Sequence, residues 1–349
     1  MIITRKWKAT AAALALVSVL GLAGCGEGSS SASKSGSTVA ASQKVENVSV
    51  NIGYTPSLCQ APLIMAYEKG YYKDVGLNVA LIKIDGASAN ESIGSGKIDA
   101  MQTLITKTIH PWQNGLPVKA TTGTHFGCVR AVVRPDSGIN EVKDLKGKKI
   151  GVAGLADTGA VVLQRALKHA GIGVTPDNME VEFVVVDRNS LPQALKSGQV
   201  DAIAMTDPVG YIAQKQYGFK AVLDTAVTKG WDKEYCCALV VSDKFIDGNA
   251  AAAKALTEAV QKGCVYVKEH PEETAQYLLE HKYFTGDMDS FVELLKSYNY
   301  APSVQGGFDA IEASVKDLGE IGIVEKTDPK AFAEANYVKF EGFKDATES

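Results

Sequence analysis

The hydrophobic positions of residues 50–84 change their spacing twice: they alternate, then recur at helical intervals, then alternate again. Residues 50–54 and 77–81 have an apolar side chain at every second position, which is typical of strands. Residues 63–71 place leucine, isoleucine and tyrosine on one stripe, which is typical of a helix. This order predicts a unit of two parallel strands joined by a helix. In open α/β sheets ligands bind at the carboxyl ends of such strands, here at the loop of residues 55–61.

A second copy of the pattern follows later in the chain. The spacing predicts strands at residues 149–153 and 180–186, with a helix at residues 159–170 between them. A short motif repeats as well, because G-K-I-D-A at residues 96–100 recurs as G-Q-V-D-A at residues 198–202. The repetition predicts two similar α/β lobes.

Two extended runs connect these lobes in the predicted fold. Residues 126–134, F-G-C-V-R-A-V-V-R, lead from the first lobe to the second, and the apolar residues 235–241 are the candidate return. Helices are expected after the return, at residues 249–268, 271–281, 287–299 and 308–319. We therefore expect lobe one to comprise residues 46–127 plus 239–349, and lobe two to comprise residues 128–238.

The N-terminal residues 1–25 have the organisation of a bacterial export signal. A basic segment precedes an apolar stretch at residues 9–22. The sequence L-A-G-C at residues 22–25 resembles the lipobox of bacterial lipoproteins, and a plain secretory signal with an incidental cysteine is the alternative. We expect a lipoprotein signal peptide with Cys25 as the lipidated residue, followed by a flexible Gly/Ser/Ala tether at residues 26–45. The mature protein would then be exported and lipid-anchored at the outer face of the cell membrane.

The segment E-K-G-Y-Y-K-D-V-G-L-N-V at residues 68–79 follows the first predicted helix. It resembles a segment of the solute-binding proteins of ABC importers in the nitrate/sulfonate/taurine group, and the resemblance continues to about residue 280. It implies a two-lobed type II periplasmic-binding-protein fold, with two neighbouring antiparallel hinge strands and an interlobe cleft. It also implies a monomer that captures a small solute by hinge closure and delivers it to an ABC permease with its ATPase. The resemblance implies no catalytic residue and no cofactor.

Two other functions stay open at this point. The pyrimidine-precursor synthases of thiamine biosynthesis share this fold and carry C-C-C-F-C where this chain has Y-C-C-A at residues 235–238. Only two of those cysteines match, and export is unexpected for such an enzyme, so we expect the protein not to be an enzyme. The third possibility is a binding module that serves a membrane sensor instead of a permease.

Composition narrows the choice of partners. The formal net charge is −4, and removing the three basic residues of the signal takes it to −7, which argues against a nucleic-acid partner. The chain has no G-x-S-x-G, P-loop, H-E-x-x-H or C-x-x-C motif. Few arginines are available for a multiply charged anion, so we expect a small neutral, zwitterionic or monoanionic solute. Outside the signal the arginines are Arg130, Arg134, Arg165 and Arg188.

Candidate ligand contacts lie at the carboxyl ends of the predicted strands, including a polar loop expected at residues 103–108, and along the two hinge runs. Thr158 begins a predicted helix, where free N–H groups bind anionic groups, but Thr158 or Asp157 could equally be a plain N-cap. Asp207 would favour an N–H group on the ligand, or could also cap a helix. The candidates are Tyr54, Ser57, Cys59, Gln60, Thr103, Thr106, Thr124, His125, Cys128, Thr158, Asp207, Cys236 and Cys237.

Five cysteines remain once Cys25 is assigned to lipid, and an odd number cannot pair completely. They could be buried free thiols, which we take as the default, or include a disulfide, or line the cleft for a soft metal or a metal-bearing solute. Strand alternation lets only one of Cys236 and Cys237 face the cleft. The candidate metal ligands are Cys59, His125, Cys128 and Cys237.

Overall fold

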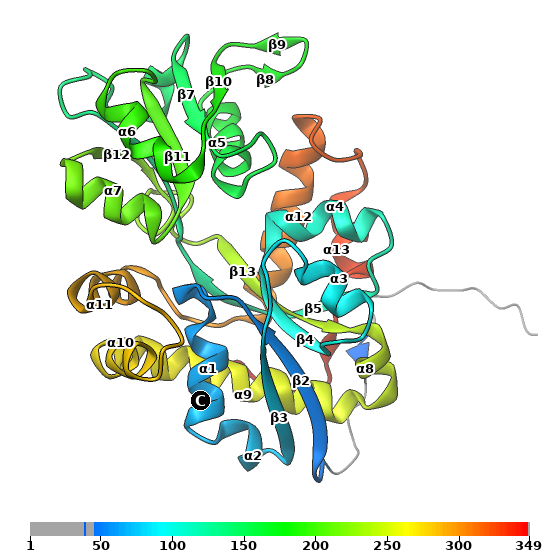
Figure 1. Ribbon diagram of the computed structural model, residues 1–349. Helices are drawn as coiled ribbons and strands as arrows, with labels where there is room; N and C mark the ends of the chain where they lie inside the picture. The colour runs from blue at the N-terminus through cyan, green and yellow to red at the C-terminus, as the bar shows by residue number, and fades with distance from the viewer. Residues whose placement is uncertain (1–37, 40–44, 348–349) are drawn as a thin grey trace, which may run out of the picture. The chain divides into compact units, whose positions relative to one another are not determined.

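The computed structural model of the protein describes residues 38–39 and 45–347, and Figure 1 shows its two large sheets. The first sheet has five strands in the spatial order β3 (Leu77–Lys83), β2 (Val48–Tyr54), β4 (Ala100–Leu104), β13 (Tyr235–Ser242) and β5 (Val118–Phe126). β2 pairs in parallel with β3 and β4, and β13 pairs antiparallel with β4 and β5. The predicted strand–helix–strand unit at the start of the fold is confirmed.

Helices from both ends of the described chain accompany this first sheet. The earlier ones are α1 (Ala61–Glu68), α2 (Tyr71–Asp74), α3 (Ala89–Gly94) and α4 (Ile105–Gln113), preceded by the short helix η1 (Leu58–Gln60). The later ones are α8 (Asp243–Gly248), α9 (Ala250–Glu269), α10 (Pro271–Glu280), α11 (Met288–Ser297), α12 (Val304–Glu320) and α13 (Pro329–Ala335). Among the described residues, none of the helices combines the length and the apolar character that crossing a bilayer requires.

The second sheet also has five strands, in the order β10 (Glu182–Val185), β7 (Lys149–Val152), β11 (Ala202–Thr206), β6 (Val129–Val133) and β12 (Lys220–Asp224). β7 is parallel to β10 and β11, and β6 is antiparallel to β11 and β12. Its helices are α5 (Thr158–His169), α6 (Leu191–Lys196) and α7 (Val209–Tyr217), with the turns η2 (Val142–Leu145) and η3 (Arg188–Ser190) and the small hairpin β8 (Val174–Thr175) and β9 (Asn178–Met179). The mixed α/β architecture with two sheets is the predicted fold class.

The two sheets repeat one design, as the recurring G-x-[I/V]-D-A motif predicts. In each sheet the first strand of the repeat lies between the second and the third, as β2 lies between β3 and β4 and β7 lies between β10 and β11. The aspartate of the motif fixes this arrangement in both copies. Asp99 Oδ2 accepts from the backbone N–H of Asn51 at 2.8 Å, and Asp201 Oδ2 accepts from that of Lys149 at 2.9 Å. Each motif therefore ties the third strand of its repeat to the first.

The chain passes between the sheets along two neighbouring segments. β5 ends at Phe126 and β6 begins at Val129, so the run predicted as one strand over residues 126–134 is broken. The break lies at Gly127 and Cys128, which both have positive φ values, 85° and 93°. The return segment ends in β13, which pairs antiparallel with β5 from the Tyr235–Phe126 pair onward. The two crossing segments thus lie side by side and antiparallel.

Two local expectations are wrong. The polar loop expected at residues 103–108 is instead the end of β4 and the first turn of α4. Threonine at three of its positions hid the buried stripe of Ile105, Ile109 and Trp112, which has helical spacing. The expected tether at residues 26–45 is not coil throughout, because its Thr38–Val39 forms β1 and pairs in parallel with β14 (Lys339–Phe340). The proposed lipidation site Cys25 lies outside the described residues.

Candidate functional site

A cavity of about 160 Å³ opens at the carboxyl ends of β2 and β4. The helix η1 closes one side of it, and β13 contributes one cysteine. Five of the residues predicted from the sequence lie in its wall, namely Ser57, Cys59, Gln60, Thr103 and Cys237. Five of the predicted contacts therefore share one cavity where β2 and β4 end, and their contact with a ligand stays a prediction. Its remaining lining residues are Gly53, Thr55, Ile84, Gly86, Ala89, Met101, Gln102, Leu104 and Lys107.

Two glutamines in this wall have an unusual hydrogen-bonding state. Gln60 Nε2 donates to the backbone oxygen of Gln102 at 3.2 Å, and Gln102 Nε2 donates to the backbone oxygen of Cys59. Because each amide nitrogen faces a carbonyl, each side-chain oxygen points elsewhere, and neither oxygen has a hydrogen-bond partner among the described residues. Both side chains are buried, Gln60 with 6% and Gln102 with 4% of its surface exposed. An unsatisfied buried acceptor costs about 1–3 kcal/mol, so a donor that reached either oxygen would stabilise the protein.

Gln102 is a site residue that the sequence analysis missed. The predicted contacts in this region began at Thr103, because the ligand-facing polar loop was expected at residues 103–108. In the structure β4 continues to Leu104, and Gln102 is a buried polar residue within a strand. The signal that could have identified it is a polar residue that directly follows the apolar residues 100–101 at the end of a strand pattern.

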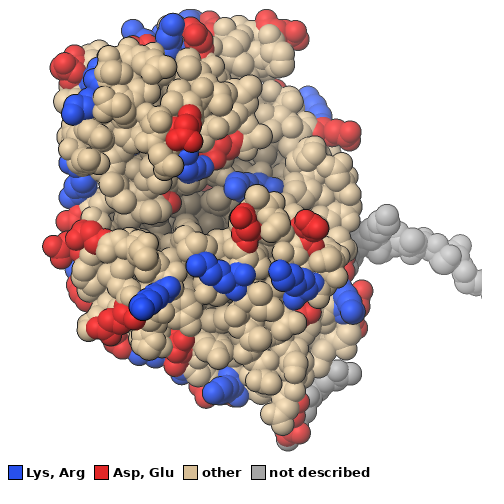
Figure 2. Space-filling model, in the orientation of Figure 1, with Lys and Arg blue, Asp and Glu red and all other residues tan. Residues whose placement is uncertain are grey.

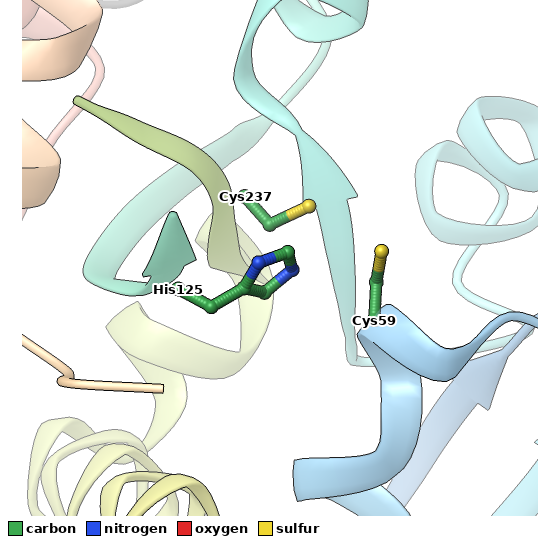
Figure 3. A group of neighbouring side chains, drawn as sticks. All are labelled: Cys59, His125 and Cys237. Atoms are coloured by element: carbon green, nitrogen blue, oxygen red, sulfur yellow. The ribbon is translucent and has the colours of Figure 1, made fainter. Parts of the chain in front are cut away.

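Four cysteines and one histidine meet beside the cavity. Cys59 lies on η1, His125 near the end of β5, Cys128 in the link to β6, and Cys236 and Cys237 at the start of β13. The ligand atoms of Cys59, His125 and Cys237 lie within 4.8 Å of one another, and so do those of Cys128, Cys236 and Cys237. Figure 3 shows the thiols of Cys59 and Cys237 facing the imidazole of His125. The cysteines of residues 45–347 are free thiols.

The pKa values of these thiols are strongly perturbed. Hydrogen bonds from the thiols of Cys128 and Cys237 hold the pKa of Cys59 well below its usual range, and His125 contributes in the same direction. Burial raises the pKa values of Cys236 and Cys237 well above the usual range. Cys59 is therefore the thiol of this cluster that is most readily ionised.

His125 is held in one orientation. Its Nδ1 lies 3.0 Å from the backbone oxygen of Phe126, and because a carbonyl only accepts, Nδ1 donates there. Its ring stacks on Tyr298 with a centroid separation of 5.4 Å and tilts against Tyr300 at 5.3 Å. Tyr300 also donates its hydroxyl to the backbone oxygen of Leu58 at 3.0 Å, which ties η1 to the same aromatic wall. The other ring nitrogen of His125, Nε2, consequently keeps its lone pair.

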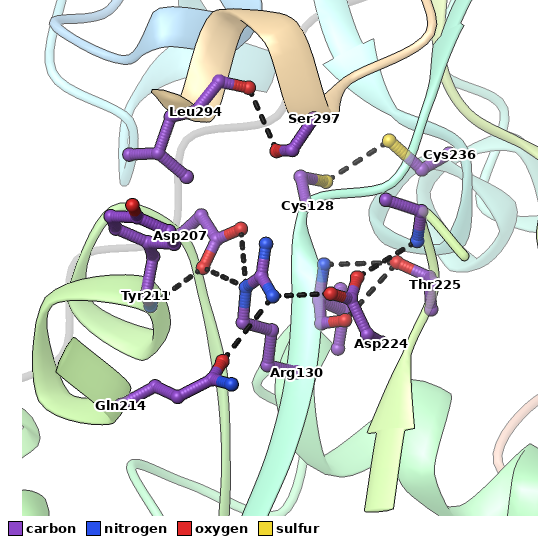
Figure 4. A network of polar contacts seen from close by, with 12 residues as sticks. Cys128, Arg130, Asp207, Tyr211, Gln214, Asp224, Thr225, Cys236, Leu294 and Ser297 are labelled. Carbon is purple, nitrogen blue, oxygen red and sulfur yellow. Dashed lines mark hydrogen bonds and ion pairs between the residues drawn. The ribbon is translucent and has the colours of Figure 1, made fainter. Parts of the chain in front are cut away.

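Asp207, another predicted contact, lies in a second buried network, shown in Figure 4. Arg130 Nε donates to both carboxylate oxygens of Asp207 at 3.1 Å, and the backbone N–H of Tyr211 donates to one of them at 2.9 Å. Arg130 also pairs with Asp224 and donates to Gln214 Oε1 at 3.4 Å. Burial raises the pKa of Asp207 to about 7, against the attraction of Arg130. Both oxygens of Asp207 are thus already engaged within the protein.

The other predicted residues lie in separate surroundings. Tyr54 packs edge-on against Tyr283 at 5.7 Å. Thr124 donates its hydroxyl to the backbone oxygen of Cys237 at 3.2 Å, which supports the cysteine cluster. Thr106 and Thr158 line a smaller cavity with Cys236, and Thr158 Oγ1 is buried with no partner among the described residues. The cap of α5 is Asp157, whose carboxylate accepts from Gly159 N at 3.1 Å.

The four arginines outside residues 1–25 all have protein partners. Besides the network of Arg130, Arg165 pairs with Glu234 and Asp317, and Arg188 pairs with Asp157 at 2.5 Å. Arg134 donates to the backbone oxygens of Leu195 and Val200 at 2.8 and 3.0 Å. Figure 2 shows acidic and basic side chains interspersed over the visible face. A site with strong anion-binding arginines is therefore not found among the described residues.

Two α/β sheets of one design, two adjacent crossing segments and a cavity at the carboxyl ends of parallel strands are features of the periplasmic-binding-protein fold. The periplasmic aliphatic sulphonate-binding protein SsuA of Escherichia coli has this fold, with a TM-score of 0.68 and 16% identity over 85% of this chain and 94% of that one. The family model described as NMT1/THI5 like matches residues 59–274, more than half of the chain. The chain belongs to the NMT1/THI5-like family.

Relatives of the chain carry names of two kinds. A 4-amino-5-hydroxymethyl-2-methylpyrimidine phosphate synthase of Aspergillus parasiticus is 27% identical over 239 residues, which cover 65% of this chain and 68% of the synthase. A putative aliphatic sulfonates-binding protein of Bacillus subtilis is 26% identical over 233 residues, with shares of 65% and 67%. The expectation that the protein is not an enzyme is contradicted, because relatives of comparable similarity are named as synthases. The expected export of the protein, and the match of only two cysteines to the C-C-C-F-C run of the synthases, were insufficient grounds for that expectation.

Proposed function

We propose that the protein is an extracytoplasmic solute-binding protein of an ABC importer and binds its solute in the cavity at the ends of β2 and β4. The fold class, the sulfonates-binding relative and the signal-like N-terminus support this function. In this proposal the protein is a monomer anchored through Cys25, and an ABC permease with its ATPase receives the solute. Binding would favour a closed arrangement of lobe one (residues 46–127 and 239–349) and lobe two (residues 128–238).

The observation that carries the proposal is the pair of unsatisfied oxygens on Gln60 and Gln102. Two buried acceptors in the wall of one cavity are stabilised when a ligand supplies two donors. The solute would therefore carry at least two N–H or O–H groups. Because the arginines outside the signal all have protein partners, a neutral or zwitterionic compound fits better than a compound with several negative charges. A small amino-substituted heterocycle such as an aminopyrimidine has these properties.

A second candidate function is synthesis of the kind named for the Aspergillus parasiticus relative. The cluster of Cys59, His125, Cys128, Cys236 and Cys237 favours it, since ionisable thiols and an imidazole beside a cavity are groups that carry chemistry. Expression of residues 46–349 in the cytoplasm of a strain that requires 4-amino-5-hydroxymethyl-2-methylpyrimidine tests it. Growth without the added pyrimidine would favour the synthase over the binding protein.

The binding function is tested by titration calorimetry with a panel of small compounds. The panel contains 4-amino-5-hydroxymethyl-2-methylpyrimidine, taurine, methanesulfonate and nitrate. We expect the compounds with N–H donors to bind and the two simple anions not to bind. Gln102→Met keeps the size of the side chain but removes the acceptor, so it should weaken binding about fivefold to tenfold, the value of one hydrogen bond near 1 kcal/mol.

The matched control is Gln276→Met. Gln276 is an exposed residue of α10 that donates to Glu280 and does not line the cavity. Its affinity should equal that of the parent. Tight binding of nitrate or methanesulfonate, undiminished in Gln102→Met, would refute the assignment of the solute class.

A further inference from the structure

We propose that Cys59, His125 and Cys237 form a binding site for one Zn²⁺ ion in the wall of the cavity. The three side chains come from η1, β5 and β13, segments that are far apart in sequence and that the fold brings together (Figure 3). The site goes beyond the proposed function, because solute binding to the two glutamines does not require a metal ion.

The distances suit tetrahedral coordination after small side-chain movements. The three ligand atoms lie within 4.8 Å of one another. Zinc binds sulfur at about 2.3 Å and imidazole nitrogen at about 2.0–2.1 Å, which places tetrahedral ligand atoms roughly 3.5–3.8 Å apart. Each edge therefore needs to contract by at most about 1.3 Å, and a change of this size lies within the reach of cysteine rotamers.

The surroundings of His125 are those of a metal ligand. Zinc-bound histidine usually donates its other ring N–H to a carbonyl or a carboxylate, which fixes the tautomer. Here Nδ1 donates to the Phe126 backbone oxygen at 3.0 Å, and Tyr298 and Tyr300 pack against the ring. The lone pair of Nε2 is thereby available without any rearrangement of the backbone.

Charge balance favours Zn²⁺ over a monovalent ion. All three side chains are buried, with exposed fractions of 7%, 0% and 1% for Cys59, His125 and Cys237. Two thiolates and a neutral imidazole neutralise a divalent cation, whereas they leave Cu⁺ with a net negative charge in a buried place. A mixed nitrogen and sulfur set is also typical of zinc.

Two groups could supply the fourth ligand of a tetrahedral Zn²⁺ ion, one on the protein and one on a solute in the cavity. Cys236 Sγ lies 3.6 Å from Cys237 Sγ and 3.9 Å from His125 Nε2, so its thiol is within reach. Cys59 and Cys237 both line the cavity, so a donor atom of a solute could take this position instead. Cys128 and Cys236, whose sulfurs are 3.0 Å apart, could also join as a disulfide in an oxidising compartment. That bond would leave the three proposed ligands intact.

The test uses the full chain, purified under reducing conditions, stripped with a chelator and titrated with Zn²⁺ against a chromophoric competitor. One equivalent of Zn²⁺ should bind. Co²⁺ in place of zinc should give thiolate-to-cobalt charge-transfer absorption and intense tetrahedral visible bands. Cys59→Ser and Cys237→Ser should each lower the affinity at least tenfold and weaken the charge-transfer band. The matched control Cys264→Ala changes a buried cysteine of α9 that belongs to neither metal-ligand group, and it should bind like the parent.

Several outcomes would overturn the site. A parent protein that gives no charge-transfer band with Co²⁺ excludes thiolate ligation, whether or not the variants fold. Equal affinity in the parent and in Cys59→Ser places the metal elsewhere. A Cys59–Cys237 disulfide in the native protein, or binding of Cu⁺ without any binding of Zn²⁺, also contradicts the proposal. A Cys128–Cys236 disulfide together with one bound Zn²⁺ supports it. Failure of these tests leaves the solute titrations unaffected, so the two proposals are judged separately.

Discussion

The buried network around Arg130 gives the sharpest prediction about stability. Arg130 has 5% of its surface exposed and pairs with Asp207 and Asp224 (Figure 4). Methionine in its place keeps most of the packing of the side chain but leaves both carboxylates without their cation. Removing one partner of a buried ion pair costs about 3–5 kcal/mol, so Arg130→Met should lower the free energy of unfolding by that amount at pH 7.

The loss should depend on pH in a definite direction. Burial raises the folded-state pKa of Asp207 to about 7, above the value of 3.8 for a free carboxyl group. When folding raises the pKa of a carboxyl group, that group stabilises the protein fully at pH values below its pKa in the unfolded state. This stabilisation is lost as the pH rises toward its pKa in the folded state. Without Arg130 the folded-state pKa of Asp207 moves higher still, so the variant continues to lose stability above pH 7. At pH values above the raised pKa, each further increase of that pKa by one adds about 1.4 kcal/mol to the deficit in stability of the variant.

Urea denaturation followed by tryptophan fluorescence at pH 5.5, 7.0 and 8.5 measures the effect. The difference between the parent and Arg130→Met should be smallest at pH 5.5 and largest at pH 8.5. Adding Asp207→Asn to the variant should abolish the extra loss at pH 8.5. Arg188→Met is the control, because the Arg188 side chain is 36% exposed and its pair with Asp157 is worth about 1 kcal/mol or less. A deficit for Arg130→Met that is under 1 kcal/mol, or that shrinks as the pH rises, would refute this reasoning.

Three further predictions follow from other parts of the chain. Cys25→Ala should shift the protein from the membrane fraction to the soluble fraction or leave it unprocessed, and an unchanged distribution on fractionation and gels would contradict the lipoprotein assignment. Gly123→Ala should destabilise the protein by about 1–3 kcal/mol in thermal unfolding, because a Cβ there would lie 2.5 Å from Tyr235 Cδ1 and 3.0 Å from Gly307 Cα. The control is Gly138→Ala, which has open space around it and tests only the cost of a positive φ. Asp99→Ala and Asp201→Ala should each lower the free energy of unfolding by about 0.5–1.5 kcal/mol, and by similar amounts, since the two carboxylates accept equivalent backbone hydrogen bonds. A large difference between the two variants would argue against equivalent roles in the two repeats.

Much of the fold could be predicted because its signals are local and repeated. The alternation of residues 50–54 and the helical stripe that follows describe β2 and α1 with small errors at their ends. The recurring G-x-[I/V]-D-A motif predicted a second lobe, and the reason is the aspartate bond that each copy makes. The helical stripe over residues 63–71 is divided at Gly70, whose positive φ of 78° ends α1 and starts α2.

The rest depends on tertiary contacts that spacing does not encode. The stripe of Ile105, Ile109 and Trp112 was obscured by threonines, which are as common in loops as in the first turn of a helix. Gln102 is a candidate site residue because it is buried within β4, which continues to Leu104 where a polar loop was expected. Asp207 could be placed near the carboxyl end of a strand, but its partner Arg130 lies 77 residues earlier, and nothing local indicates their pairing.

The convergence of the cysteines was predictable in outline and not in detail. Placing Cys128 and Cys236 on adjacent antiparallel segments follows from the crossing pattern, and their sulfurs lie 3.0 Å apart. The alternation argument predicts that only one of Cys236 and Cys237 faces the cleft, and in the structure the two residues line different cavities. Their sulfurs are nevertheless only 3.6 Å apart, because irregular pairing of β13 with β5 at this point brings both side chains to the same cluster.

Native mass spectrometry of the protein, purified from its own cells without unfolding, tests the central claim most directly. The claim is that a small solute with N–H or O–H donors occupies the cavity beside Gln60 and Gln102. We predict a one-to-one adduct whose released compound carries at least two such donors and no more than one negative charge, and whose retention falls in Gln102→Met but not in Gln276→Met. A retained compound without donors, or one held equally well by Gln102→Met, would contradict the account.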